Sequence, residues 1–110
     1  MKGIVFLSGL VSSLLTLGII LPGLSQVTSD GTTNTTIKLN GNNFDILNGI
    51  QKGNNLFHSF QEFSIPRGSS ATFNNSTDVV NIINRVTGGN ISNIDGLIKA
   101  NGNANLFLIN

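Results

Sequence analysis

The sequence predicts an all-β fold, arranged either as a sandwich or as a solenoid of short strands. Three observations support this prediction. Short apolar runs are separated by corners rich in Asn and Gly, of which the chain has 17 and 13 among 110 residues. No long stretch with helical spacing connects these runs. Charged residues are only 10% of the chain, against about 25% in ordinary soluble domains.

Length and charge restrict the classes of function. At 110 residues with a formal net charge of +1, the chain has room for one small domain and cannot present a basic face to nucleic acid. Cysteine is absent, which excludes disulfides, thiolate metal sites and a cysteine nucleophile. We therefore expect no nucleic-acid partner and no cofactor.

Residues 1–25 are predicted to be a secretory signal peptide. Lys2 precedes an apolar run, and small residues at Gly23 and Ser25 fit cleavage at or near Gln26. The run is also close to the length of a membrane helix, so an uncleaved anchor is the alternative. Cleavage leaves residues 26–110 with five basic and five acidic side chains.

The first half of this remaining chain holds two alternating runs and an aromatic segment. Residues 35–39 and 44–47 each end at an Asn-Gly pair and read as strands. Three Phe residues follow at a spacing of three, within residues 57–65. For them, core packing is favoured over a helical stripe or an exposed aromatic patch.

The second half continues with short runs. Residues 77–86 have apolar positions at helical spacing, but most of these positions are β-branched, which favours a strand. The remaining runs are bounded by Asn and Gly and are also expected to be strands; they are residues 71–73, 91–94, 97–98 and 106–109.

The high Asn content favours the solenoid over the sandwich. In a parallel β-helix each coil takes about 20–25 residues, and Asn side chains stacked at the corners can form a hydrogen-bonded ladder. Asn also tolerates the left-handed conformation that corners need. Disorder is the alternative for an Asn-rich chain, but aliphatic and Phe residues lie between the Asn residues throughout.

Two sequence blocks carry a family resemblance. The first is residues 55–68, with Ser59-Phe60, Phe63 and Ile65 in the pattern Ser/Asn-Phe, two residues, Phe, one residue, aliphatic. The second is residues 93–110, which end in Asn-Leu-Phe-Leu-Ile-Asn. Together they resemble the haemagglutination-activity (filamentous haemagglutinin N-terminal) domain of two-partner-secreted exoproteins. The residues of the two blocks are similar to those of cyanobacterial members.

This resemblance implies a right-handed parallel β-helix with an N-terminal cap. Residues 26–110 would be the N-terminal part of the domain. Because the family's Asn-Pro-Asn-Gly-Ile motif would open at Asn110, the β-helix is expected to be incomplete at its C-terminal end. The implied function is secretion targeting and β-helix nucleation for a large adhesin-like exoprotein.

The resemblance also implies partners and a location. The Sec translocon and signal peptidase would bring the chain to the periplasm, and a dedicated outer-membrane transporter would move it to the cell surface or the medium. A host or cell-surface glycan is a possible target of downstream repeats. The residues assigned to transporter recognition and folding are Phe57, Ser59, Phe60, Phe63, Ile65, Asn105, Leu106, Phe107, Leu108, Ile109 and Asn110.

An enzyme is not expected. His58 lies beside Ser59 and four residues from Glu62, but adjacent side chains of a strand face opposite ways, so a surface or cap-facing His58 is favoured over a catalytic one. The single carboxylates are scattered and show no metal-binding spacing. The alternatives are a secreted pectate-lyase-like β-helix enzyme, which needs clustered charged residues, and a structural surface protein.

Overall fold

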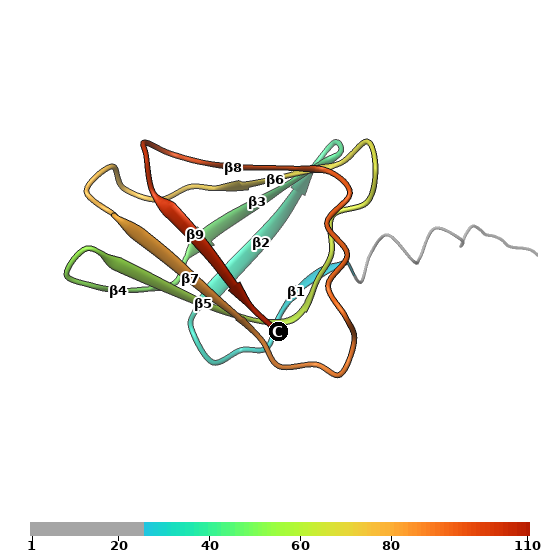
Figure 1. Cartoon of the computed structure of the whole chain (residues 1–110), viewed down its shortest axis with the longest axis horizontal. Coiled ribbons are helices and arrows are strands. Elements are labelled where there is room, and N and C mark those ends of the chain that lie inside the picture. The colour runs from blue at the N-terminus through green and yellow to red at the C-terminus, as the bar shows by residue number, and fades with distance from the viewer. Residues whose placement is uncertain (1–25) are drawn as a thin grey trace, which may run out of the picture.

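The computed structural model describes residues 26–110, and the predicted signal peptide lies outside this range. The described residues form strands and no helix, which confirms the all-β prediction (Figure 1). No helix of this range is therefore long and apolar enough to cross a membrane. The strands are β1 (Val27–Ser29), β2 (Thr35–Asn40), β3 (Asn43–Asn48), β4 (Ile50–Lys52), β5 (Asn55–Phe63), β6 (Ser70–Phe73), β7 (Asn81–Val86), β8 (Leu97–Ala100) and β9 (Asn105–Ile109).

These strands form two mixed sheets. In the first sheet β5, β7 and β9 run parallel, while β1 and β4 pair antiparallel with β5. In the second sheet β3, β6 and β8 run parallel, and β2 pairs antiparallel with β3. From β5 onwards the chain alternates between the two sheets (Figure 1). One passage through both sheets is called a coil, and each strand pairs with the strand of the same sheet in the preceding coil.

Asn ladders join successive coils, as the composition predicts. Asn55, Asn81 and Asn105 are in register at the start of β5, β7 and β9. The Asn81 side-chain amide donates to Asn55 at 2.9 Å, over 26 residues, and that of Asn105 donates to Asn81 at 3.2 Å, over 24 residues. A left-handed backbone occurs instead at Asn34 and Asn48, with φ of 58° and 66°.

A second ladder lies after β6 and β8. The backbone N–H of Asn101 donates to Oδ1 of Asn75 at 3.0 Å, and Nδ2 of Asn75 donates to the Asn101 carbonyl at 3.1 Å. Nδ2 of Asn101 donates to the Asn75 carbonyl at 2.9 Å. Asn75 is only 6% exposed, so this polar side chain is buried with its partners satisfied.

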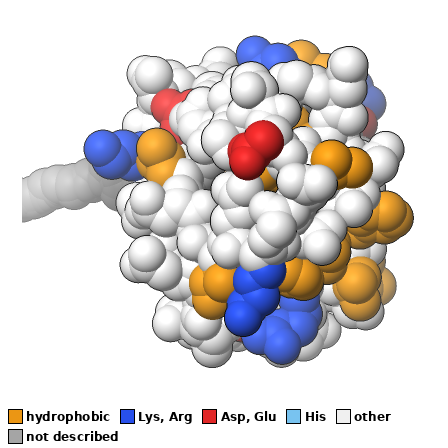
Figure 2. All heavy atoms as spheres, turned by 90° about the vertical axis from the view of Figure 1, so that its left-hand side faces the viewer, with side chains coloured by type: hydrophobic (Ala, Val, Ile, Leu, Met, Phe, Trp, Pro, Cys, Tyr) orange, Lys and Arg blue, Asp and Glu red, His pale blue; other side chains and the backbone are white. Residues whose placement is uncertain are grey.

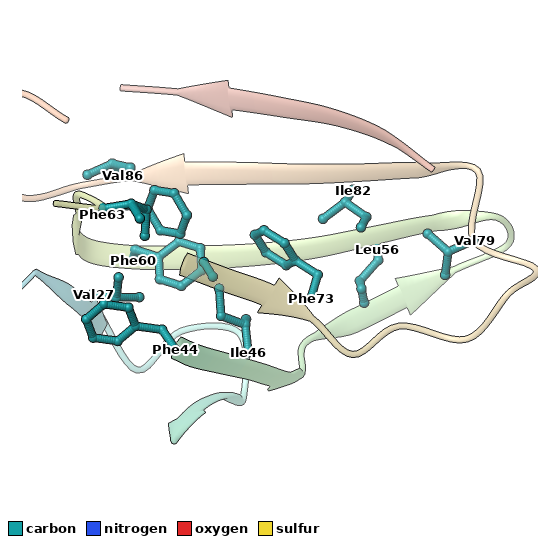
Figure 3. Close-up of a cluster of buried hydrophobic side chains, with 12 residues drawn as sticks. Val27, Phe44, Ile46, Leu56, Phe60, Phe63, Phe73, Val79, Ile82 and Val86 are labelled. Atoms are coloured by element: carbon teal, nitrogen blue, oxygen red, sulfur yellow. The ribbon is translucent and has the colours of Figure 1, made fainter. Parts of the chain in front are cut away.

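The hydrophobic core lies between the two sheets (Figure 3). Phe60 lies at its centre, with ring centroids 4.9 Å from Phe63, and Phe63 is 6.2 Å from Phe73. All three rings are almost completely buried. The aliphatic and remaining aromatic members come mainly from β1, β3, β5 and β7; they include Val27, Phe44, Ile46, Leu56, Ile82 and Val86.

Two expected strands differ from the structure. The strand predicted over residues 77–86 begins at Asn81, because residues 77–80 form the turn between the sheets. The strand predicted over residues 91–94 is wrong: only Ile94 forms an isolated parallel bridge, with Ile65, and Ile91 is 79% exposed. Backbone contacts with the preceding coil are limited to Asn93 and its neighbours, at Ser64 and Ile65, so no strand forms here.

The corner between β7 and β8 is bounded by two close backbone approaches. A Cβ atom on Gly88 would lie 2.1 Å from the carbonyl oxygen of Gln61, and one on Gly96 would lie 2.3 Å from that of Ser69. Each glycine therefore lets the corner pass against the preceding coil.

We predict that Asn75→Ala lowers the free energy of unfolding by about 2–4 kcal/mol, because it removes the three hydrogen bonds of this buried side chain, one with Ser76 and two with Asn101. Asn103→Ala is the control, since Asn103 is exposed, and we expect a change of less than about 0.5 kcal/mol. Urea unfolding measures both. Equal effects of the two substitutions would contradict the role given to the ladder.

Candidate recognition surface

The residues assigned to transporter recognition fall in two segments, 57–65 and 105–110, whose strands lie in one sheet. Residues 57–65 contain most of β5, residues 105–110 contain β9, and β7 lies between them. The backbones are in register, with Phe57 opposite Ile83 and Ile83 opposite Phe107. Segments far apart in the sequence thus share one surface.

The first part of β5 alternates between the two faces of this sheet. Leu56, His58 and Phe60 point into the core and are at most 5% exposed. Phe57 lies on the opposite, outer face and is half-buried. This is the two-residue period of a strand.

A bulge then changes the alternation. The pairing of β1 with β5 skips Gln61, and this extra residue places Phe63 on the inner side with Phe60. Phe63 and Ile65 are 2% and 0% exposed. The spacing of three between Phe60 and Phe63 therefore reflects a bulged strand, and the expectation of core packing is confirmed for both residues.

An apolar row crosses the outer face of the first sheet. Ile50, Phe57, Ile83 and Phe107 pair in register across β4, β5, β7 and β9. Phe107 is 48% exposed, and Ile109 lines a shallow hollow together with Phe57 and Ile83. Figure 2 shows hydrophobic side chains reaching a surface that is otherwise mostly uncharged.

This outer row corrects one expectation. Core packing was expected for the three Phe residues of the first segment, but Phe57 lies on the outer face, as do Phe107 and Ile109 of β9. The physical reason is the strand period, which sends alternate residues to opposite faces. In β9, Leu106 and Leu108 are the inward residues, opposite Ile82 and Asn84.

The two Asn residues that bound the second segment have separate contacts. Asn105 is the last rung of the first Asn ladder. Asn110 is exposed, and its side-chain amide donates to the hydroxyl of Ser92 at 3.0 Å.

Ser59 anchors the residues that follow β1. Its hydroxyl donates to Oδ2 of Asp30 at 2.6 Å, its backbone N–H donates to the Thr33 hydroxyl at 2.9 Å, and its carbonyl accepts the Asp30 N–H at 3.3 Å. The Ser59 hydroxyl also accepts from Nε of Arg85 at 3.0 Å. Ser59 is therefore buried by polar contacts rather than by apolar ones.

The Asp30 carboxylate collects donors from three parts of the chain. Besides Ser59, the Thr87 hydroxyl donates to Oδ2 at 2.8 Å, and the Thr32 hydroxyl donates to Oδ1 at 2.7 Å. Desolvation raises the pKa of Asp30, but the hydrogen bonds from Ser59, Thr32 and Thr87 outweigh it and hold the pKa well below its usual range. Asp30 therefore stays ionised at neutral and mildly acidic pH.

His58 is 2% exposed, so the expectation of a surface histidine is wrong. Its Nδ1 lies 2.8 Å from the Thr35 hydroxyl, and its ring centroid lies 5.8 Å from that of Phe60 and 5.5 Å from that of Phe73. Desolvation lowers the pKa of His58 to about 4.

The structure does not bring His58, Ser59 and Glu62 together. His58 contacts Thr35, the Ser59 hydroxyl contacts Asp30, and Glu62 accepts from Asn90 at 2.7 Å. Within residues 26–110 no three His, Cys, Asp or Glu side chains are grouped as metal ligands would be.

Sequence reasoning missed Asp30, Thr33, Arg85 and Thr87. The contacts that bring these residues to Ser59 and to one another join positions 26 to 57 apart, such as Thr33 with Ser59 and Asp30 with Thr87. No local pattern marks such pairs. The spacing of about one coil between Ser59 and Arg85 is the only available signal, and it requires knowing the register.

Comparison with known proteins gives one family. The TPS secretion domain matches residues 25–110, which is most of the chain. No curated protein matches the chain.

We predict that the free energy of unfolding falls by about 2 kcal/mol between pH 7.5 and pH 5 because of His58. The unfolded state, with a histidine pKa near 6.5, takes up a proton in this range, whereas the folded state with a pKa of about 4 does not. The stability contribution is thus complete above pH 6.5 and is lost as the pH falls toward 4.

The measurement is urea unfolding at several pH values, with His58→Asn as the comparison. Asn retains a polar group near Nδ1 but does not titrate, so the variant should lose most of the slope between pH 7.5 and 5. An unchanged slope in this variant would assign the pH dependence to other groups.

Proposed function

The chain belongs to the TPS secretion domain family, and from this premise we propose that the segments Phe57–Ile65 and Asn105–Asn110 are recognised by its transporter. Membership in this family makes the chain a module for two-partner secretion. The protein is therefore secreted, and its partner is an outer-membrane transporter. This family is a secretion module rather than a catalytic family.

The observation that carries the proposal is that both segments are rich in Phe and aliphatic residues, carry only one charged side chain, Glu62, and lie in one sheet. Phe57, Ile83 and Phe107 form one cross-strand row. Before folding, an extended segment of this kind adds as a strand to a sheet edge of the transporter's periplasmic part, where backbone hydrogen bonds supply affinity and pockets for alternate side chains supply selectivity. Few charges need to be desolvated in this contact.

Binding and folding then compete for the same strands. Phe60, Phe63 and Ile65 are almost fully buried in the folded protein, and β5 and β9 both pair with β7. A segment held by the transporter cannot make these contacts. Folding outside the cell therefore withdraws the chain from the transporter and makes transport directional.

We further propose that residues 26–110 are the capped start of a right-handed parallel β-helix in an adhesin-like exoprotein. The parallel order β5, β7, β9 and the two Asn ladders support this. Within the described residues β8 and β9 are edge strands, and a following coil would pair there. Such a module nucleates the repeats that carry the adhesive function.

The export route through the Sec translocon and the periplasm is also part of this proposal. We predict that the exported protein begins at or near Gln26, because Gly23 and Ser25 fit the small-residue preference of signal peptidase. N-terminal sequencing of the exported material tests this. A chain that still begins at Met1 would contradict cleavage and favour the anchor.

Two double substitutions test recognition. Phe57→Ala with Phe107→Ala removes outer rings, and Phe60→Ala with Phe63→Ala removes buried ones. We predict that both weaken capture of the unfolded chain by the transporter's periplasmic domain at least about tenfold, since each removes two rings from the bound strands. Only the inner pair should also cost several kcal/mol of folding stability, about 3–5 for each fully buried ring.

Capture is measured by a pull-down of chain diluted from denaturant, and export by the amount of protein in the medium. Ile91→Ala is the matched control, because Ile91 is apolar, 79% exposed and outside both segments. If the outer-pair variant is captured and exported as well as the parent, transporter recognition through these rings is wrong. If the Ile91→Ala variant also lost capture, the pull-down would report the overall hydrophobicity of the chain, and the proposal that these two segments are recognised would be wrong.

A further inference from the structure

The residues at the beginning of the fold are attached to two different coils. We call residues 27–35 the N-terminal segment; it contains β1 and the chain leading into β2. On β5 it is held by antiparallel pairing, by the Thr33 hydroxyl accepting from the Ser59 N–H, and by the contact between Thr35 and His58. These contacts belong to the first coil.

The N-terminal segment is also contacted by Arg85 of β7 and by Thr87, the residue that follows β7, one coil later. Thr87 donates to Oδ2 of Asp30 at 2.8 Å, across 57 residues. Nη2 of Arg85 donates to the Thr32 hydroxyl at 3.3 Å, across 53 residues. Arg85 also reaches Asp30 through Ser59, whose hydroxyl accepts from the guanidinium and donates to the carboxylate.

Removal of β7 would therefore leave the Asp30 carboxylate incompletely paired. The carboxylate would keep its hydrogen bonds from Ser59 and Thr32 but lose the one from the Thr87 hydroxyl. It would also lose the positive charge of Arg85, which polarises the Ser59 hydroxyl. A partly buried carboxylate needs such donors to stay ionised without a large desolvation cost. The N-terminal segment is thus expected to bind β5 alone more weakly than it binds the pair of β5 and β7.

We propose that Asp30, Ser59, Arg85 and Thr87 form a clasp that locks the N-terminal segment only after β7 has joined the first sheet. The clasp makes the beginning of the chain the last part of the first two coils to become stable. It does not depend on the proposed recognition of the transporter, since it follows from contacts within the folded chain.

The order of folding tests the clasp in the exported protein. Protein is diluted from denaturant and labelled by short pulses of hydrogen exchange, followed by mass spectrometry of its peptides. The expected result is that residues 27–35 gain protection with or after β7. Protection of residues 27–35 before β7 would overturn the proposal, and this measurement needs no variant.

Native-state hydrogen exchange tests the residues of the clasp. Thr87→Val removes one hydroxyl that lies 57 residues from Asp30, and Asp30→Asn removes the charge. Each should accelerate exchange of residues 27–35 by about tenfold or more, the equivalent of one charge-assisted hydrogen bond. Exchange in β8 and β9 should stay unchanged.

Asp45→Asn is the matched control. This carboxylate accepts from Asn43 at 2.7 Å within the same strand and reaches no other coil. It should leave the exchange of residues 27–35 unchanged. Equal acceleration along the whole chain in Thr87→Val, or no acceleration in residues 27–35, would overturn the clasp.

Discussion

The stacking of equivalent residues from one coil on the next is the constraint on which the rest of this structure depends. Parallel pairing of β5, β7 and β9 places Asn55, Asn81 and Asn105 directly beside one another. Neutral amides gain from this arrangement because each can donate to one neighbour and accept from the other, whereas like charges at the same position would repel. The low charge and high Asn content of the chain are thus consequences of its pairing pattern.

The same register separates two kinds of apolar residue within a single strand. Phe60 and Phe63 are buried between the sheets because a bulge at Gln61 resets the alternation of β5, while Phe57 stays on the outer face. The outer row contributes less to the core and is free to contact a partner. A secretion module of this construction can keep its folding residues and its surface residues on neighbouring positions without one set replacing the other.

Local patterns were sufficient to predict most strands. Alternation marks β2 and β3, β-branched residues mark β7, and Asn/Gly corners mark the ends of several others. Local patterns could not show that residues 91–94 form only a single bridge, nor that Asp30 meets Thr87, since both depend on which segments become neighbours. A surface position was one of the alternatives expected for His58, and it is wrong. The burial of His58 depends on the Thr35 hydroxyl of β2, which is distant in the sequence. The two segments proposed for recognition were chosen from the family pattern, but their division into inner and outer residues required the register.

The corner between β7 and β8 has an evolutionary consequence. Gly88 and Gly96 hold its two ends against the preceding coil, while Ile91 between them is almost fully solvated. Hydrogen-bonded residues of successive coils are 26 positions apart at Asn55 and Asn81, but 29 positions apart at Ser64 and Asn93. The corner therefore already contains more residues than the stacking of the strands requires. Because loop entropy rises slowly with length, insertions beside the exposed Ile91 would leave the sheets, the ladders and the bridge between Ile65 and Ile94 in place. This loop is therefore where the module tolerates changes in length and sequence at the smallest cost in stability, whereas a change in the stacked strands affects two coils at once.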